Sequence, residues 1–136
     1  MSHLVETLLL HIRANKLPAP VLEHRFAAEH VGLGNGVRQR LKDADLQDWR
    51  FDLAWPEKMI AVECEGGIHS NGRHVRGKGY EGDLHKYNAA MLLGWSVARF
   101  SGGMIKNGKA IDTVAVLLSG PSENNTQKGS TRESHA

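Results

Sequence analysis

A β-hairpin over residues 49–67 constrains the fold of this 136-residue chain more than any other segment. Successive side chains of a strand point to opposite faces. The apolar residues of each half therefore share one face: Phe51, Leu53 and Trp55 in the first half, and Ile60, Val62 and Cys64 in the second. Pairing Leu53 with Val62 joins both sets and leaves residues 56–59 as a loop of common hairpin length. A slip of one residue would turn both sets away from the core, so this register is favoured.

The same register gathers carboxylates on the other face of the hairpin. Asp52 lies opposite Glu63, and Glu65 follows two residues later on the same strand. Like charges in direct opposition destabilise a sheet, and carboxylates held this close normally share a proton or a cation. An all-oxygen ligand set favours Mg²⁺ or Mn²⁺ over zinc. The alternative is an acidic hairpin face that only contacts solvent.

The composition is that of one ordinary globular domain. Charged residues make up 24% of the chain, apolar residues 40%, and the formal net charge is +2. No apolar run reaches membrane-spanning length and the start has no signal-peptide pattern, so we expect a cytoplasmic protein without a membrane partner. Cys64 is the single cysteine, which excludes an intramolecular disulfide. We expect it to be a small apolar strand residue.

Periodicity and helix-breaking residues predict the other elements. In chain order these are a helix capped by Ser2, an ambiguous strand or helix at 21–29, a helix at 80–93 that Gly94 ends, a strand at 95–100, and a last helix carrying Ile111, Val114 and Leu118. We expect Leu84, Tyr87 and Met91 to share one side of the helix at 80–93. We also expect the three tryptophans to fill the core rather than stack on bases: Trp49, Trp55 and Trp95.

The order of these elements predicts the fold class. A strand–helix–strand crossover after the hairpin places the strand at 95–100 beside the earlier strands, with the helix on one face. The predicted fold is therefore α/β, with a small mixed β-sheet of hairpin plus crossover strand, flanked by helices. Polar residues dominate the end of the chain. This predicts a single domain over residues 1–119 and a disordered polar tail over residues 120–136.

Residues 68–79, directly after the hairpin, form a segment rich in glycine, histidine and basic residues. Its candidate nucleic-acid-binding side chains are His69, Arg73, His74, Arg76 and Lys78. A cationic, glycine-rich loop beside a carboxylate cluster suits contact with a phosphate backbone. The alternative is a solvated surface loop, and zinc binding by the two histidines lacks further close ligands.

An Asp near the end of one strand, Glu-x-Glu on the next, and a crossover helix and strand resemble the PD-(D/E)XK nuclease superfamily. The local sequence is similar to phage and prophage endonuclease-like proteins, which share their layout with very-short-patch repair endonucleases. The stretches that carry this similarity are 50–56, 61–67, 72–74, 83–88, 94–95 and 99–100, and the resemblance covers residues 22–118. It implies a restriction-endonuclease-like fold and a divalent-metal-dependent endonuclease, with phosphodiester bonds of DNA as the expected substrate.

The resemblance also implies roles for single residues. Asp52 and Glu63 match the two metal-binding acids. The third motif position is usually lysine and here is Glu65, which could complete the metal site or accept the proton of the attacking water. Lys86 on the crossover helix is the candidate replacement for that lysine, although it could instead be a solvated residue paired with Asp83. Two further acids are possible members of the site: Glu23 and Asp83.

Two other classes of function remain open. The chain could be a catalytically inactive nucleic-acid-binding module with a nuclease fold, because Glu65 departs from the usual motif. It could also be a small phage assembly or regulatory protein whose acids hold a structural divalent ion. The sequence leaves open DNA versus RNA as the partner, and a monomer versus a homodimer.

Overall fold

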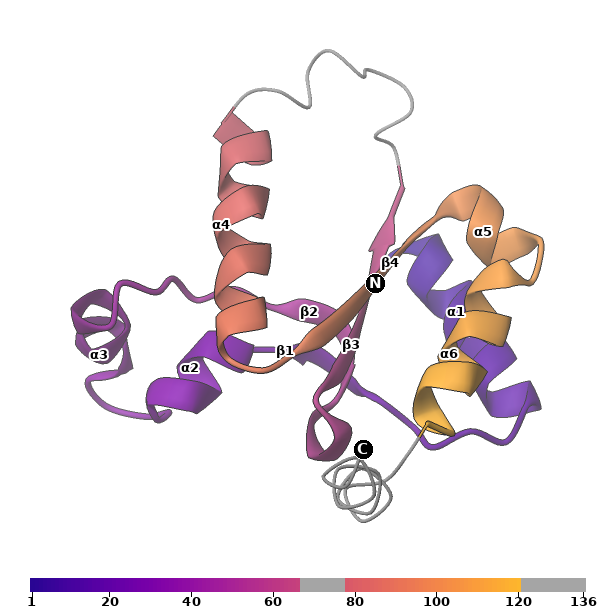
Figure 1. Ribbon diagram of the computed structural model, residues 1–136, viewed down its shortest axis with the longest axis horizontal. Coiled ribbons are helices and arrows are strands. Elements are labelled where there is room, and N and C mark those ends of the chain that lie inside the picture. The colour runs from indigo at the N-terminus through magenta and orange to yellow at the C-terminus, as the bar shows by residue number, and fades with distance from the viewer. Residues whose placement is uncertain (67–77, 121–136) are drawn as a thin grey trace, which may run out of the picture.

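In the computed structural model, which describes residues 1–66 and 78–120, a four-stranded mixed sheet forms the middle layer (Figure 1). Its strands, in the order in which they pair, are β1 (Val21–His24), β2 (Phe51–Trp55), β3 (Ile60–Glu65) and β4 (Ser96–Ser101). β1, β2 and β3 are antiparallel neighbours, whereas β3 and β4 are parallel. Helix α4 (Lys78–Leu92) lies between β3 and β4 in the chain. The predicted α/β class with a small mixed sheet flanked by helices is confirmed.

Helices cover both faces of the sheet, as Figure 1 shows. One face carries α1 (His3–Ala14), α5 (Gly102–Lys106) and α6 (Lys109–Leu118), and the other carries α2 (Phe26–Val31), α3 (Val37–Asp43) and α4. Each face has its own apolar core. The first includes Leu8, Trp55, Val62 and Val114, and the second includes Phe26, Phe51, Ala61 and Trp95. Because both faces are buried, polar side chains on the central strands have to find partners within the protein.

The hairpin has the predicted register where its strands are paired. Leu53 pairs with Val62 and Trp55 with Ile60, and a short 3₁₀ turn, η1 (Pro56–Lys58), occupies the loop. Phe51 was expected on the face of Leu53, but it packs in the second core. That prediction was wrong because strict alternation requires continued pairing, and the β2–β3 ladder ends at Leu53 and Val62.

The ambiguous segment at 21–29 contains both predicted alternatives. Its first four residues form β1 at the edge of the sheet, and α2 begins at Phe26. The ring of Phe26 stacks on that of Phe51, with 4.1 Å between ring centroids. This contact joins residues far apart in the sequence, so the local pattern could not place the boundary between the strand and the helix.

Two predicted helix ends are confirmed. The Ser2 hydroxyl accepts from the Val5 backbone N–H at 3.2 Å, capping α1. Gly94 follows α4 with φ of 96°, and the next backbone N–H, of Trp95, donates to the carbonyl of Ala90 at 2.9 Å. At the far end of the chain, α6 ends at Leu118. The predicted tail lies outside the described residues, apart from Gly120.

The side of α4 that carries Leu84, Tyr87 and Met91 is not an apolar face packed on a core. Leu84 and Met91 are 44% and 72% exposed. The helix instead turns Lys86, Tyr87 and Ala90 toward the sheet. Its second half carries the two side chains that bond Glu63 on β3, so polar groups are needed there in place of an apolar stripe. In the described part of the chain, no helix combines the length and the apolar character needed to span a membrane.

Arg40 orders the turn between α2 and α3. Its guanidinium donates to four backbone carbonyls at 2.6–3.2 Å, those of Val31, Gly32, Leu33 and Asn35. Gly32, Gly34 and Gly36 all have positive φ, which glycine adopts without a steric penalty. The turn can therefore bend its carbonyls around one cation.

We predict that Arg40→Met lowers the free energy of unfolding by about 1.5–3 kcal/mol, because several charge-assisted hydrogen bonds disappear together. Arg38→Met is the matched control, since Arg38 is exposed on the same helix, and it should change stability by less than about 0.5 kcal/mol. Urea unfolding followed by circular dichroism measures both. Equal stability of the two variants would show that Arg40 does not hold the turn.

Candidate functional site

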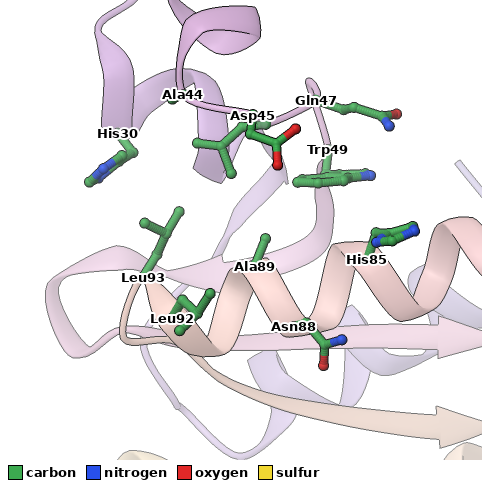
Figure 2. Close-up of a pocket in the computed structure, with 11 residues that line it drawn as sticks. His30, Ala44, Asp45, Gln47, Trp49, His85, Asn88, Ala89, Leu92 and Leu93 are labelled. Atoms are coloured by element: carbon green, nitrogen blue, oxygen red, sulfur yellow. The ribbon is translucent and has the colours of Figure 1, made fainter.

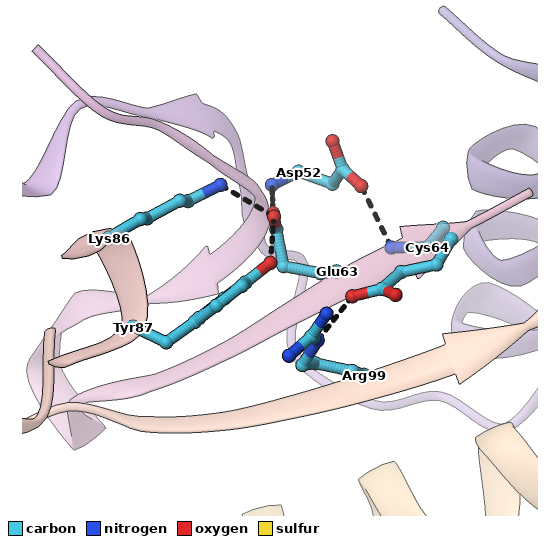
Figure 3. Close-up of polar contacts among 7 residues, drawn as sticks. Asp52, Glu63, Cys64, Lys86, Tyr87 and Arg99 are labelled. Carbon is cyan, nitrogen blue, oxygen red and sulfur yellow. Dashed lines mark hydrogen bonds and ion pairs between the residues drawn. The ribbon is translucent and has the colours of Figure 1, made fainter. Parts of the chain in front are cut away.

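The carboxylate cluster lies where β2 and β3 stop pairing (Figure 3). The backbone N–H of Asp52 donates to Glu63 Oε2 at 2.8 Å, and the backbone N–H of Cys64 donates to Asp52 Oδ2 at 2.8 Å. At this end of the hairpin, side-chain-to-backbone hydrogen bonds connect the two strands in place of backbone-to-backbone pairs. Asp52 and Glu63 are therefore neighbours across the two strands, and each carboxylate accepts from the backbone of the opposite strand.

Glu63 is the only buried charged side chain in the described part of the chain, at 8% exposed. Its Oε1 accepts from Lys86 Nζ at 2.6 Å and from the Tyr87 hydroxyl at 2.8 Å. With the bond from Asp52, three of about four lone-pair positions are in use. An ion pair this deeply buried is tolerated only where hydrogen bonds satisfy both partners. The alternative interpretation of Lys86, a solvated residue paired with Asp83, is wrong.

Tyr87 is a site residue that the sequence reasoning missed, because its spacing fitted an apolar stripe with Leu84 and Met91. Burial, followed by the charge of Glu63, raises the pKa of its hydroxyl well above the ordinary 10. Tyr87 is therefore a neutral donor to Glu63 over the whole working pH range. No spacing in the sequence signalled this role, because adjacent residues of a helix do not normally face the same target.

Arg99 on β4 is the second missed residue. It forms an ion pair with Glu65, and its guanidinium lies 4.2 Å from the centroid of the Tyr87 ring. The bond to Glu65 is the largest cause that raises the pKa of Arg99, and the charge of Asp83 adds to it. Of the two predicted acids, Glu65 thus contacts this arginine directly, and Asp83 acts on it only through its charge. Its side chain is 45% exposed, so it remains accessible to an external anion.

Asp52 differs from Glu63 in its electrostatic surroundings. Burial raises its pKa, and the charges of Glu63 and Glu23 add to that effect, against the opposing Cys64 hydrogen bond and the Lys86 charge. Of the described side chains, none forms an ion pair with Asp52. Glu23, a predicted further acid, lies opposite it on β1, between the pairs Leu22–Leu53 and His24–Phe51. The cluster is therefore richer in negative charge at Asp52 than at Glu63.

These oxygens suit a hydrated hard cation. Mg²⁺ usually keeps several waters and binds one or two carboxylates together with a substrate phosphate. Asp52 commits one oxygen to Cys64, and Glu63 keeps about one lone pair on Oε2. Within residues 1–66 and 78–120, no group of three or more His, Cys, Asp or Glu is arranged around a common point. Asp52 and Glu63 are the pair that fits, whereas Glu65 would first have to leave Arg99.

Cys64 has the character expected of a small strand residue. It is partly buried against the first core. Burial, with the charges of Asp52 and Glu63, raises the pKa of its thiol to about 12. The thiol is therefore neutral, and its backbone N–H is the part that contributes to the site.

The predicted contacts to nucleic acid fall mostly on residues that the structure does not describe. His69, Arg73, His74 and Arg76 lie outside the described residues. Lys78 was expected in the loop, but it is the first residue of α4, and its side chain is likewise outside what is described. The described cations at the carboxylate cluster are Lys86 and Arg99.

No family model matches this chain, and neither a curated protein nor a solved structure matches it. What the site can do therefore follows from the side chains that the fold brings together. Those are two acids across a hairpin, of which one is neutralised by Lys86, and a second acid–base pair, Glu65 and Arg99, on the neighbouring strands.

We predict that Lys86→Met destabilises the protein by about 3–5 kcal/mol, because it leaves Glu63 buried without a counter-charge. Adding Glu63→Gln should restore part of that stability, with a coupling of about 0.5–3 kcal/mol between the two positions. A double-mutant cycle in guanidinium chloride measures the coupling. Independent, additive effects would mean that the ion pair does not hold α4 on the sheet.

We predict that Asp52→Asn raises the melting temperature at neutral pH in chelator. A raised carboxyl pKa means that Asp52 stabilises the fold most below its ordinary value of 3.8 and that this stabilisation disappears as pH rises through the higher folded value. The advantage of the mutant should therefore shrink to nothing as the pH falls below 3.8. Thermal melts across this range test it. A mutant that melts well below wild type at neutral pH would make Asp52 a structural hydrogen-bond acceptor.

Proposed function

We propose that this protein is a divalent-metal-dependent endonuclease that hydrolyses phosphodiester bonds of nucleic acid, with DNA as the first candidate. The observation that carries the proposal is the placement of Lys86 Nζ 2.6 Å from Glu63, directly across the hairpin from Asp52. Lys86 thus places a cation from the crossover helix beside the two acids. Glu65 occupies the motif position where lysine is usual. The placement of Lys86 supports the resemblance to PD-(D/E)XK nucleases.

Hydrolysis of a phosphodiester needs a nucleophilic water and relief of the negative charge that builds on phosphorus. Mg²⁺ or Mn²⁺ held by Asp52 and Glu63 would supply Lewis acidity and a bound water of lowered pKa. Lys86 fixes the Glu63 carboxylate, and its Nζ lies 5.8 Å from the centroid of the Phe51 ring, in partly apolar surroundings. A fixed cation there opposes developing negative charge more strongly than it would in water.

Arg99 and Glu65 complete the proposed chemistry. Arginine binds phosphate through two parallel hydrogen bonds, and the half-exposed Arg99 can turn from Glu65 toward an incoming phosphate. Glu65 is then free to accept the proton of the attacking water. The departure from lysine at this position is in this view a change of base rather than a loss of function.

A second candidate is a nucleic-acid-binding module that keeps the nuclease fold without catalysis. It is favoured by the saturation of Glu63, whose oxygens already accept from Lys86, Tyr87 and Asp52. Such a network stabilises the fold without any metal. Under either function we place the protein in the cytoplasm, where a phage-encoded or prophage-encoded protein meets nucleic acid.

We predict that wild type nicks supercoiled plasmid in Mg²⁺ or Mn²⁺, and that Asp52→Asn slows single-turnover cleavage by about a hundredfold or more, the scale seen when one group that stabilises the transition state is removed. Asp112→Asn, on α6 across the sheet, is the matched control and should cleave like wild type. Because Asp52→Asn is expected to be the more stable protein, a slower rate would not reflect unfolding. Duplex, single-stranded, mismatched and branched substrates should all be assayed.

Binding measured in Ca²⁺ separates the two candidates. Tight binding without cleavage of any substrate would support the inactive module, and no binding at low salt would contradict both. A variant in which Gln replaces Arg73 and Arg76 should bind nucleic acid more weakly, since it lacks two candidate phosphate contacts. For each phosphate that the variant no longer neutralises, the log–log salt dependence of binding should flatten by about one unit.

A further inference from the structure

A pocket of about 540 Å³ lies between α4 and the loop that joins α3 to β2 (Figure 2). The loop contributes Asp45, Gln47 and Trp49, and the helix contributes His85, Asn88 and Leu92. The volume is within the range of pockets that hold small molecules. Neither Asp52 nor Glu63 lines it, so it is distinct from the carboxylate cluster.

Trp49 gives this pocket a flat aromatic wall. We expected it in the core, but it is only half buried, unlike Trp55 and Trp95. Its ring is nearly parallel to that of Phe26, with 6.2 Å between centroids and 13° between planes. Figure 2 shows its indole projecting above α4 near Ala89 and His85. An indole held in place by the core and open on the pocket side is a stacking surface for a planar group.

The polar side chains of the pocket specify the kind of planar group. Gln47 and Asn88 each carry both a donor and an acceptor, and Asp45 accepts. Of the described residues that line the pocket, none is Lys or Arg, so a phosphate would find no counter-charge inside. An uncharged heterocycle with N–H groups and ring acceptors matches this lining.

We propose that this pocket binds one unstacked nucleobase of a nucleic acid whose backbone lies at Asp52 and Glu63. The inference rests on the proposed function and narrows its substrate to strands with at least one unpaired nucleotide. Two segments connect the two places. Trp49 precedes Asp52 by three residues, and α4 borders both places: Lys86 and Tyr87 contact Glu63 from one side of the helix, whereas Asn88 lines the pocket from a different side. Turning a base out of a duplex costs unstacking and unpairing energy, and this cost is least where the base is already unpaired.

The test is a titration of metal-free protein with adenosine, guanosine, cytidine and thymidine, followed by ¹H–¹⁵N NMR. Nucleosides carry no phosphate, so binding reports the pocket alone. We expect at least one of them to shift the indole N–H of Trp49 and the side-chain amides of Gln47 and Asn88. Asn88→Leu should weaken binding severalfold, and Trp49→Leu about five- to hundredfold. Met91→Leu, an exposed substitution on the same helix outside the pocket lining, should bind like wild type.

Absence of shifts at these groups with all four nucleosides, at concentrations up to about 20 mM, would overturn the proposal. Unchanged nucleoside affinity in Asn88→Leu would also overturn the proposal. If Trp49→Leu unfolds because it packs less well on Phe26, the exposed Asn88→Leu variant still tests the pocket. The result of the nucleoside titration does not depend on whether the protein cleaves nucleic acid. Nucleoside binding without cleavage contradicts only the proposed nuclease, and cleavage without nucleoside binding contradicts only the pocket assignment.

Discussion

The ion pair between Glu63 and Lys86 joins the sheet to the crossover helix at the point where the hairpin no longer holds itself together. Beyond Leu53 and Val62, strands β2 and β3 are connected by side-chain bonds of Asp52 and Glu63. Lys86 and Tyr87 of α4 bond the carboxylate of Glu63, which is the one buried charge in the described part of the chain. Removing either partner would leave the other charge buried without compensation. This destabilises a protein more than replacing both partners with apolar residues.

This arrangement gives two neighbouring carboxylates opposite characters. Glu63 is fixed and neutralised, whereas Asp52 has a raised pKa, an acidic neighbour in Glu23 and no ion-pair partner among the described side chains. Environments that separate the behaviour of paired acids are typical of sites where one group positions and another reacts or binds. In the proposed nuclease, Glu63 would set the geometry and Asp52 would be the acid that responds to a cation.

Helix α4 has to serve two directions at once, which explains its unusual pattern. Lys86 and Tyr87 face the acids, and Ala90 continues that face into the second core. A different side of the helix, with His85 and Asn88, lines the pocket to which Trp49 also contributes. A helix of this kind cannot carry one broad apolar stripe, so Leu84 and Met91 are left exposed.

The sequence by itself determined what depends on neighbours in the chain: the hairpin register, the Ser2 cap, the end of α4 at Gly94, and the nearness of Asp52 and Glu63 across the hairpin. Turn geometry, side-chain alternation and capping act over a few residues, so they can be read locally. Only the tertiary structure decided which core receives Phe51, that Tyr87 and Arg99 join the site, and that Trp49 lines a pocket. These outcomes depend on which segments, distant in sequence, pack together, and burial of a charge or an aromatic ring between such segments outweighs local periodicity.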